Sequence, residues 1–125
     1  MNLADIYRDY IACLNRQDWP KLKDFVAEDV VHNDQQFGLS GYRQMLERDY
    51  EQIPDLRFNI KLLVSDAPYV ASRLGFDCRP IGKFLGLDVN GKRVVFTENV
   101  FYEFRDSRIT RVWSLIDKAA IPSQL

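Results

Sequence analysis

Two long segments of alternating apolar and polar residues, joined by a tight turn, most constrain the fold of this chain. Residues 92–105 and 108–117 are separated only by Asp106 and Ser107, and Asn90-Gly91 supplies a turn signal before the first of them. Residues 57–65 and 69–79 repeat the arrangement around a turn that ends in Pro68. Alternate side chains of a strand point to opposite faces, so these segments predict four long strands linked by hairpins.

The first half of the chain instead has the periodicity of helices. Apolar residues recur at helical spacing from Leu3 to Leu14, and a short helix over 18–26 is predicted, with Asp18 as its N-cap. "VVHND" reads as a brief strand. A third helix is expected from Ser40 to the residues before Pro54; one of its faces carries Tyr42, Met45, Leu46, Asp49 and Tyr50.

Helices followed by hairpin-linked strands indicate an α+β fold. We expect a cone-shaped, curved antiparallel sheet over three N-terminal helices, with a pocket inside. The 125 residues are expected to form a single domain, 1–125.

Charge and composition exclude several classes of function. The 17 basic and 18 acidic residues leave a net charge of −1, so nucleic acid is not expected as a partner. The sequence shows no secretory signal and no segment long enough to span a bilayer, so we expect a cytoplasmic protein without membrane contact. Cys13 and Cys78 lack metal-ligand spacing and are expected to be buried free thiols.

Polar residues on apolar strand faces are the candidates for chemistry. Strict alternation puts Asp117 on the same face of the last strand as Trp113 and Ile109, and puts Glu98 on the face of Phe96 and Tyr102. Asp117 is either a pocket carboxylate or a structural residue that caps the tail or forms an ion pair. Which face of strand 69–79 points inward stays open: it is the one with Arg73 and Asp77, or the one with Val70 and Leu74.

The only histidine, His32, ends the short strand beside Asn33 and Asp34. Side chains at strand ends often face clefts, and a histidine titrates near neutral pH. His32 is therefore a candidate proton shuttle, although a structural or surface role is the alternative.

The order of the segments "FVAEDVVHND", "GYRQMLERDYEQIPDLRF", "GKFLG" and "FRDSRITRVWSLIDKAAI" resembles the SnoaL-like polyketide cyclases, also called the ester cyclase group. These proteins belong to the nuclear transport factor 2-like superfamily. The spacing from Trp113 to Asp117 carries the resemblance most specifically, followed by "PDL" at 54–56. Pro80 and Val100 stand where many relatives carry histidines.

The resemblance implies a cofactor-independent acid/base enzyme, such as an aldol cyclase or an isomerase, that uses neither metal nor organic cofactor. Its substrate would be a small apolar carbonyl compound held in an internal pocket. In the family, the aspartate that matches Asp117 is the general acid/base. We expect the catalytic residues to be Asp117, His32 and Glu98, and the substrate-binding residues to be Trp113, Tyr102, Arg73, Phe96 and Tyr50.

Two other functions stay open. Limonene epoxide hydrolases share the superfamily, and Asp117, Arg73 and either Asp77 or Glu98 would resemble their two aspartates with an arginine between them. A non-catalytic binding or dimerisation module is the third possibility. The resemblance also implies a homodimer. We expect it to form through the outer sheet face, for which strict alternation predicts the apolar residues Val95, Phe101, Val112 and Ile116.

Overall fold

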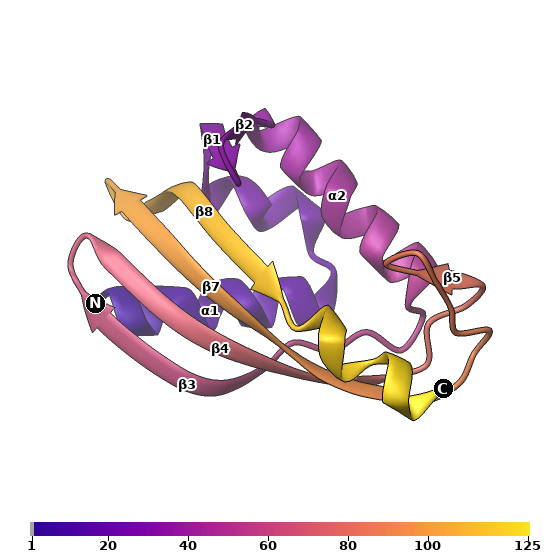
Figure 1. Cartoon of the computed structure of the whole chain (residues 1–125). Coiled ribbons are helices and arrows are strands. Elements are labelled where there is room, and N and C mark those ends of the chain that lie inside the picture. The colour runs from indigo at the N-terminus through magenta and orange to yellow at the C-terminus, as the bar shows by residue number, and fades with distance from the viewer. Residues whose placement is uncertain (1) are drawn as a thin grey trace.

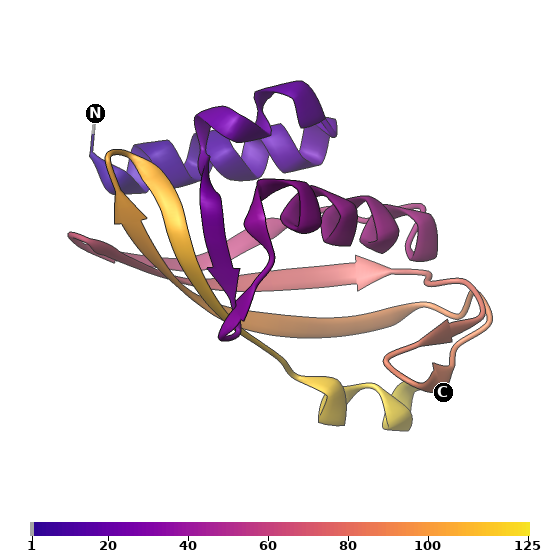
Figure 2. The ribbon, with the colours of Figure 1, turned by 90° about the horizontal axis from the view of Figure 1, so that it is seen from above.

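The computed structural model describes residues 2–125. Two helices form one layer of the fold, and a curved sheet forms the other (Figure 1). Helix α1 spans Leu3–Arg16 and α2 spans Gly38–Gln52. The 3₁₀ turn η1, Trp19–Asp24, lies between them in sequence. Figure 2 shows both helices on the same side of the sheet.

The main sheet has six strands in the order β2-β1-β8-β7-β4-β3. The long strands are β3 (Asn59–Asp66), β4 (Tyr69–Cys78), β7 (Val94–Arg105) and β8 (Arg108–Ile116). Their bounds lie within two residues of the expected ones, so the four predicted strands are confirmed. The shorter strands are β1 (Val26–His32) and β2 (Gln35–Gln36). A separate small hairpin joins β5 (Lys83–Phe84) to β6 (Leu87–Asp88).

The α+β fold class is confirmed, and three local expectations need correction. The sheet is mixed rather than wholly antiparallel, because β1 runs parallel to β8. The segment around residues 18–26 is a 3₁₀ turn rather than an α-helix, and the Asp18 side chain makes no capping hydrogen bond to it. Helix α2 also begins at Gly38, two residues before the expected N-cap, Ser40.

The core fills the space between the helices and the concave sheet face. Each helix contributes its buried stripe, and β4, β7 and β8 contribute every second residue over most of their length. Cys13 and Cys78 are buried and free, as expected. Fully buried members of this core include Tyr7, Tyr10, Leu14, Leu22, Val26, Val30, Val70, Leu74, Val94 and Ile109.

An extra residue in β8 decides which side chains face the helices. Glu103 pairs with Arg111, but its neighbour Phe104 pairs with Ile109, so Thr110 is a β-bulge. A bulge shifts the alternation by one residue. Ile109 therefore faces the core, as does Val112, while Trp113 faces away.

The C-terminal residues after β8 form two further 3₁₀ turns, η2 (Lys118–Ala120) and η3 (Pro122–Gln124). The Gln124 side chain joins the tail to β7, because it accepts from the Val95 amide at 2.7 Å and donates to the Val95 carbonyl at 2.7 Å. Within residues 2–125, none of the helices combines the length and the apolar character that crossing a membrane requires.

Candidate active site

A cavity of about 260 Å³ lies between α2, the end of α1 and the concave face of the sheet. We call it the inner cavity. Its polar lining residues are Tyr10, His32, Asn33, Tyr42, Asp49, Glu98, Tyr102 and Ser114, and its apolar ones include Leu14, Met45, Leu46, Phe58, Val112 and Ile116.

A second, smaller hollow of about 70 Å³ adjoins the inner cavity. We call it the side compartment. It shares Asp49, Phe58, Glu98 and Ile116 with the inner cavity, so two carboxyl groups lie where the spaces meet. The rest of the side compartment is apolar: Ile53, Leu56, Phe76, Phe84 and Phe96.

The two carboxyl groups come from different layers of the fold. Asp49 lies on the inward face of α2, one turn before the helix ends, and Glu98 lies on the inward face of β7. Burial, followed by the charge of Glu98, raises the pKa of Asp49 to about 7. At neutral pH the Asp49 carboxyl is therefore divided between its protonated and ionised forms.

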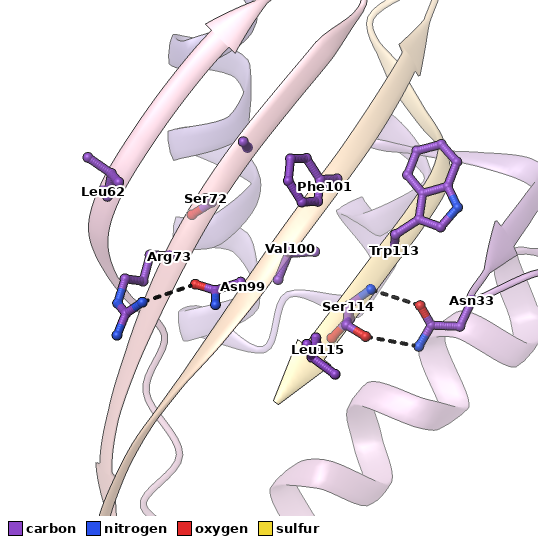
Figure 3. Close-up of a pocket in the computed structure, with 11 residues that line it drawn as sticks. Asn33, Leu62, Ser72, Arg73, Asn99, Val100, Phe101, Trp113, Ser114 and Leu115 are labelled. Atoms are coloured by element: carbon purple, nitrogen blue, oxygen red, sulfur yellow. Dashed lines mark hydrogen bonds between the residues drawn. The ribbon is translucent and has the colours of Figure 1, made fainter. Parts of the chain in front are cut away.

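Glu98 is held by a hydrogen bond across the sheet. Burial raises the pKa of Glu98, and the Ser114 hydroxyl, which donates to the Glu98 carboxylate, acts in the opposite direction. Asn33 fixes Ser114 in turn: the Ser114 amide donates to Asn33 Oδ1 at 2.8 Å, and Asn33 Nδ2 donates to the Ser114 carbonyl at 3.2 Å (Figure 3). The end of β1 thereby positions the partner of a carboxylate on β7.

His32 lines the inner cavity at the end of β1. Its ring stacks on Phe37, with centroids 5.2 Å apart and planes inclined by 14°. Burial lowers the pKa of His32, so the imidazole is neutral at neutral pH and offers one donor and one acceptor nitrogen.

Four of the predicted site residues line the inner cavity or the side compartment. Glu98, His32 and Tyr102 line the inner cavity, and Phe96 lines the side compartment. Their roles stay predictions. The inward face of β4 is the apolar one that carries Val70, Leu74 and Phe76.

The expected placement of Asp117 inside the pocket is wrong. Asp117 follows β8 at the surface, where its amide donates to the Thr97 carbonyl at 2.9 Å and its side chain makes no capping bond to η2. The reason is the bulge at Thr110, which turns Trp113, Leu115 and Asp117 outward and leaves Val112, Ser114 and Ile116 inward.

Three predicted substrate-binding residues also lie outside the inner cavity. Trp113 and Arg73 line an open groove of about 510 Å³ on the face of the sheet that points away from the helices (Figure 3). Strand alternation places Arg73 there, 3.5 Å from Asn99 Oδ1. Tyr50 lies beside the cavity, and its hydroxyl donates to the Leu14 carbonyl at 2.6 Å.

The three residues expected to mimic an epoxide hydrolase are likewise not brought together. Asp77 lies at the surface in a bidentate ion pair with Arg93, with both N–O distances 2.7 Å. Arg73 and Asp117 face outward. Of the described residues that line the inner cavity, none is a lysine or an arginine.

Sequence reasoning missed Asp49 as a site residue, although its signal was present. An aspartate that shares a helix face with Tyr42, Met45 and Leu46 is a charged group on a face that packs inward. Tyr10, Asn33 and Ser114 had no comparable signal, since their partners come from distant segments.

Comparisons with known proteins agree with the architecture. The sequence profile of the SnoaL-like polyketide cyclase family matches residues 4–125. A solved structure described as a SnoaL-like polyketide cyclase from Agrobacterium tumefaciens is 52% identical, with a TM-score of 0.98 over 99% of this chain and 98% of that one. A search of curated proteins found no match.

Two more distant structures share the fold. IdmH from Streptomyces antibioticus, a proposed polyketide cyclase, is 19% identical, with a TM-score of 0.82 over 99% of this chain and 98% of its own. AclR from Streptomyces galilaeus, a proposed hydroxylase, is 22% identical, with a TM-score of 0.78 over 94% of this chain and 90% of its own.

Proposed function

Because the chain belongs to the SnoaL-like polyketide cyclase family, we propose that it is an acid/base enzyme that moves a carbon-bound proton of a small carbonyl compound. The proposal replaces Asp117 with Asp49 as the acid/base group. The observation that carries the proposal is the Asp49 carboxyl, which lies half-buried at the inner cavity and has a pKa raised to about 7. A general base works best when its pKa lies near the operating pH.

The proposed reaction conserves protons. The ionised Asp49 removes a proton from the carbon next to a carbonyl group, and the electron pair of the C–H bond forms an enolate. The enolate carbon then bonds to a second carbonyl carbon, whose π electrons move onto its oxygen. That oxygen takes the proton back from Asp49, which leaves the aldol product and regenerates the base. Return of the proton to another carbon would instead give an isomer.

Glu98 and His32, which both line the inner cavity, support this cycle in different ways. The negative charge of Glu98 keeps the pKa of Asp49 high, so protonated Asp49 gives up its proton only to a basic oxygen or carbon. His32 is neutral and adds no positive charge that would lower the pKa of Asp49. Either of its ring nitrogens can form a hydrogen bond to a substrate oxygen.

The test is proton exchange and ring closure on simple ketones. The wild-type protein and the variants Asp49→Asn and Asp117→Asn are incubated in deuterium oxide with alkyl aryl ketones, and NMR records deuterium entering the carbon beside the carbonyl. Ring closure of a linear diketone with three carbons between its carbonyls is followed by carbon NMR, as the loss of one of its two carbonyl signals. Wild-type exchange that is lost only in Asp49→Asn supports the proposal. Equal exchange in wild type and Asp49→Asn contradicts it.

Two carboxyl groups at one cavity also favour a second candidate, hydrolysis of an epoxide. One acid would protonate the epoxide oxygen while the other carboxylate activates water. A panel of small epoxides, assayed for diol formation with the same variants, separates this reaction from ketone chemistry. Binding of both panels without turnover would favour a non-catalytic module.

We also propose that a second copy of the chain covers the outer sheet face. Leu62, Phe101 and Leu115 line the outer groove and are 60%, 55% and 73% exposed. Adjoining apolar side chains of this kind usually mark an interface. Val112 and Ile116, which strict alternation placed on this face, instead line the inner cavity.

A further inference from the structure

Four tyrosines form a hydroxyl cluster between the helices and the sheet. The hydroxyl oxygens of Tyr10 and Tyr42 lie 2.7 Å apart, and the Tyr7 hydroxyl donates to Tyr102 at 3.4 Å. The rings of Tyr10 and Tyr102 meet edge to face, with centroids 6.1 Å apart. Tyr10 comes from α1, Tyr42 from α2 and Tyr102 from β7, and all three line the inner cavity.

The two hydroxyls of the Tyr10–Tyr42 pair carry one hydrogen more than the hydrogen bond between them requires. Each phenol carries one hydrogen, and a hydrogen bond between the two hydroxyls uses only one of them. Burial raises the pKa of both Tyr10 and Tyr42, and the Glu98 charge acts in the same direction, so both hydroxyls are protonated at neutral pH. A buried donor normally finds an acceptor. Because both residues line the inner cavity, an oxygen atom of a bound ligand can be that acceptor.

Helix α2 fixes the distance from this pair to the acid/base group. Tyr42 and Asp49 share one face, two turns apart, so their backbones are separated by about 10 Å at a rise of about 1.5 Å per residue. Met45 and Leu46 lie between them on the same face and are apolar. Helical side chains lean toward the N-terminus, so Tyr42 leans away from Asp49 while Asp49 leans toward Tyr42. Because the tyrosine side chain is the longer one, this lean does not bring the two polar groups closer together than their backbones.

We propose that the Tyr10–Tyr42 pair is a subsite for a second substrate oxygen, remote from the carbon that reacts at Asp49. The proposal rests on the proposed function only for the position of the reacting carbon. It defines the substrate class as elongated, flat ketones that carry a hydroxyl or second carbonyl about two helical turns from the acidic carbon.

The remaining lining supports a flat, aromatic shape for that substrate. Aromatic rings line both spaces, with Phe58 common to the two, and Phe76, Phe84 and Phe96 enclose the side compartment. At about 70 Å³ this compartment takes only a short apolar group, such as the methyl of an acetyl ketone. The inner cavity, at about 260 Å³, is below the roughly 300–1,000 Å³ of sites for drug-sized ligands. The substrate is therefore small.

The experiment compares two probes that differ in one hydroxyl group. An acetylnaphthol, with hydroxyl and acetyl groups at opposite ends of the naphthalene, and the acetylnaphthalene that lacks the hydroxyl are titrated against the protein by calorimetry. The wild type should bind the acetylnaphthol about two- to tenfold more tightly, the range for one hydrogen bond. Tyr42→Phe and Tyr10→Phe should each reduce that ratio toward one.

Tyr50→Phe is the matched control, because Tyr50 does not line the inner cavity and its hydroxyl already donates to the Leu14 carbonyl. This variant should keep the wild-type ratio. Thermal melts verify that each variant is folded. Equal binding of the two probes by the wild type, a ratio unchanged in both Tyr42→Phe and Tyr10→Phe, or no binding of either probe overturns the proposal.

Asp49→Asn separates this proposal from the proposed function. It should retain the preference for the acetylnaphthol while ketone exchange is lost. A wild-type protein that keeps the preference but exchanges no ketone proton would remove the proposed function and leave the subsite in place.

Discussion

Asp49 on α2 and Glu98 on β7 line the same two adjoining spaces, and the charge of Glu98 contributes to raising the pKa of Asp49 to about 7. Neither segment on its own would raise the pKa of its carboxyl group. A carboxyl on a helix surface or on an exposed strand would ionise near pH 4. The packing of α2 against the sheet therefore creates a carboxyl group that titrates near neutral pH.

Replacing Asp49 with asparagine should abolish most turnover while leaving the protein folded. The change keeps the shape and removes the titrating proton, so the rate should fall about 10²–10⁴-fold. Steady-state rates on an active ketone measure the effect. Asp117→Asn is the control; because Asp117 lies at the surface, its rate should stay close to that of the wild type.

The same substitution should raise thermal stability in a pH-dependent way. The pKa of Asp49 is higher in the folded state than the ordinary value of 3.8, so its contribution to stability is complete below pH 4 and is lost as the pH rises toward 7. Asparagine does not titrate. The Tm of Asp49→Asn minus that of the wild type should therefore increase between pH 4 and pH 7. A difference that is constant across this range would show that Asp49 titrates normally.

Glu98→Gln should move the acidic limb of the pH–rate profile to lower pH. The Glu98 charge is one cause of the raised pKa of Asp49, and burial is the larger one, so the pKa falls below 7 but stays above 3.8. The readout is kcat/KM against pH, because it reports groups of the free enzyme. A profile that loses height without moving would mean that Glu98 does not act through Asp49.

Asn33→Ala should destabilise the fold by about 0.5–1.5 kcal/mol, the usual net contribution of a hydrogen bond, because Asn33 is exposed and water can reach the freed partners. It removes both bonds to the Ser114 backbone, at 2.8 and 3.2 Å, and leaves the backbone bond from the Asn33 amide to the Val112 carbonyl to hold the end of β1 on β8. Urea unfolding measures the loss. Asn59→Ala is a comparison at another strand, where the side chain donates to the Gly75 carbonyl at 3.2 Å, and its loss should be smaller.

Phe101→Asp should convert the proposed homodimer to monomers. Phe101 is 55% exposed in the centre of the outer groove, and a charge there would be buried on association. Sedimentation at micromolar concentration measures the mass. Ile81→Asp is the matched control, because Ile81 is 54% exposed but lies in the loop after β4, outside the groove. A monomeric wild type would refute the dimer.

The sequence alone determined the four long strands of this fold. Strand alternation and turn residues located β3, β4, β7 and β8 to within two residues, because both signals are local and depend only on neighbouring side chains. The inward face of β7 followed from the same alternation and placed Glu98 and Tyr102 at the cavity. Resemblance to the SnoaL-like family added the arrangement of helices over one face of a curved sheet.

Only the tertiary structure decided the site. The bulge at Thr110 reverses the face of β8 beyond it and sends Asp117 and Trp113 outward, and such a bulge is set by pairing with β7 rather than by local preference. The raised pKa of Asp49 requires both the burial that α2 gains on the sheet and the charge of Glu98 from a distant strand. Alternation is a property of a single segment, whereas desolvation and Coulomb interactions depend on which segments meet. The meeting of Asp49 with Glu98 at one cavity, and the raised pKa that results from it, were therefore not contained in the residue pattern.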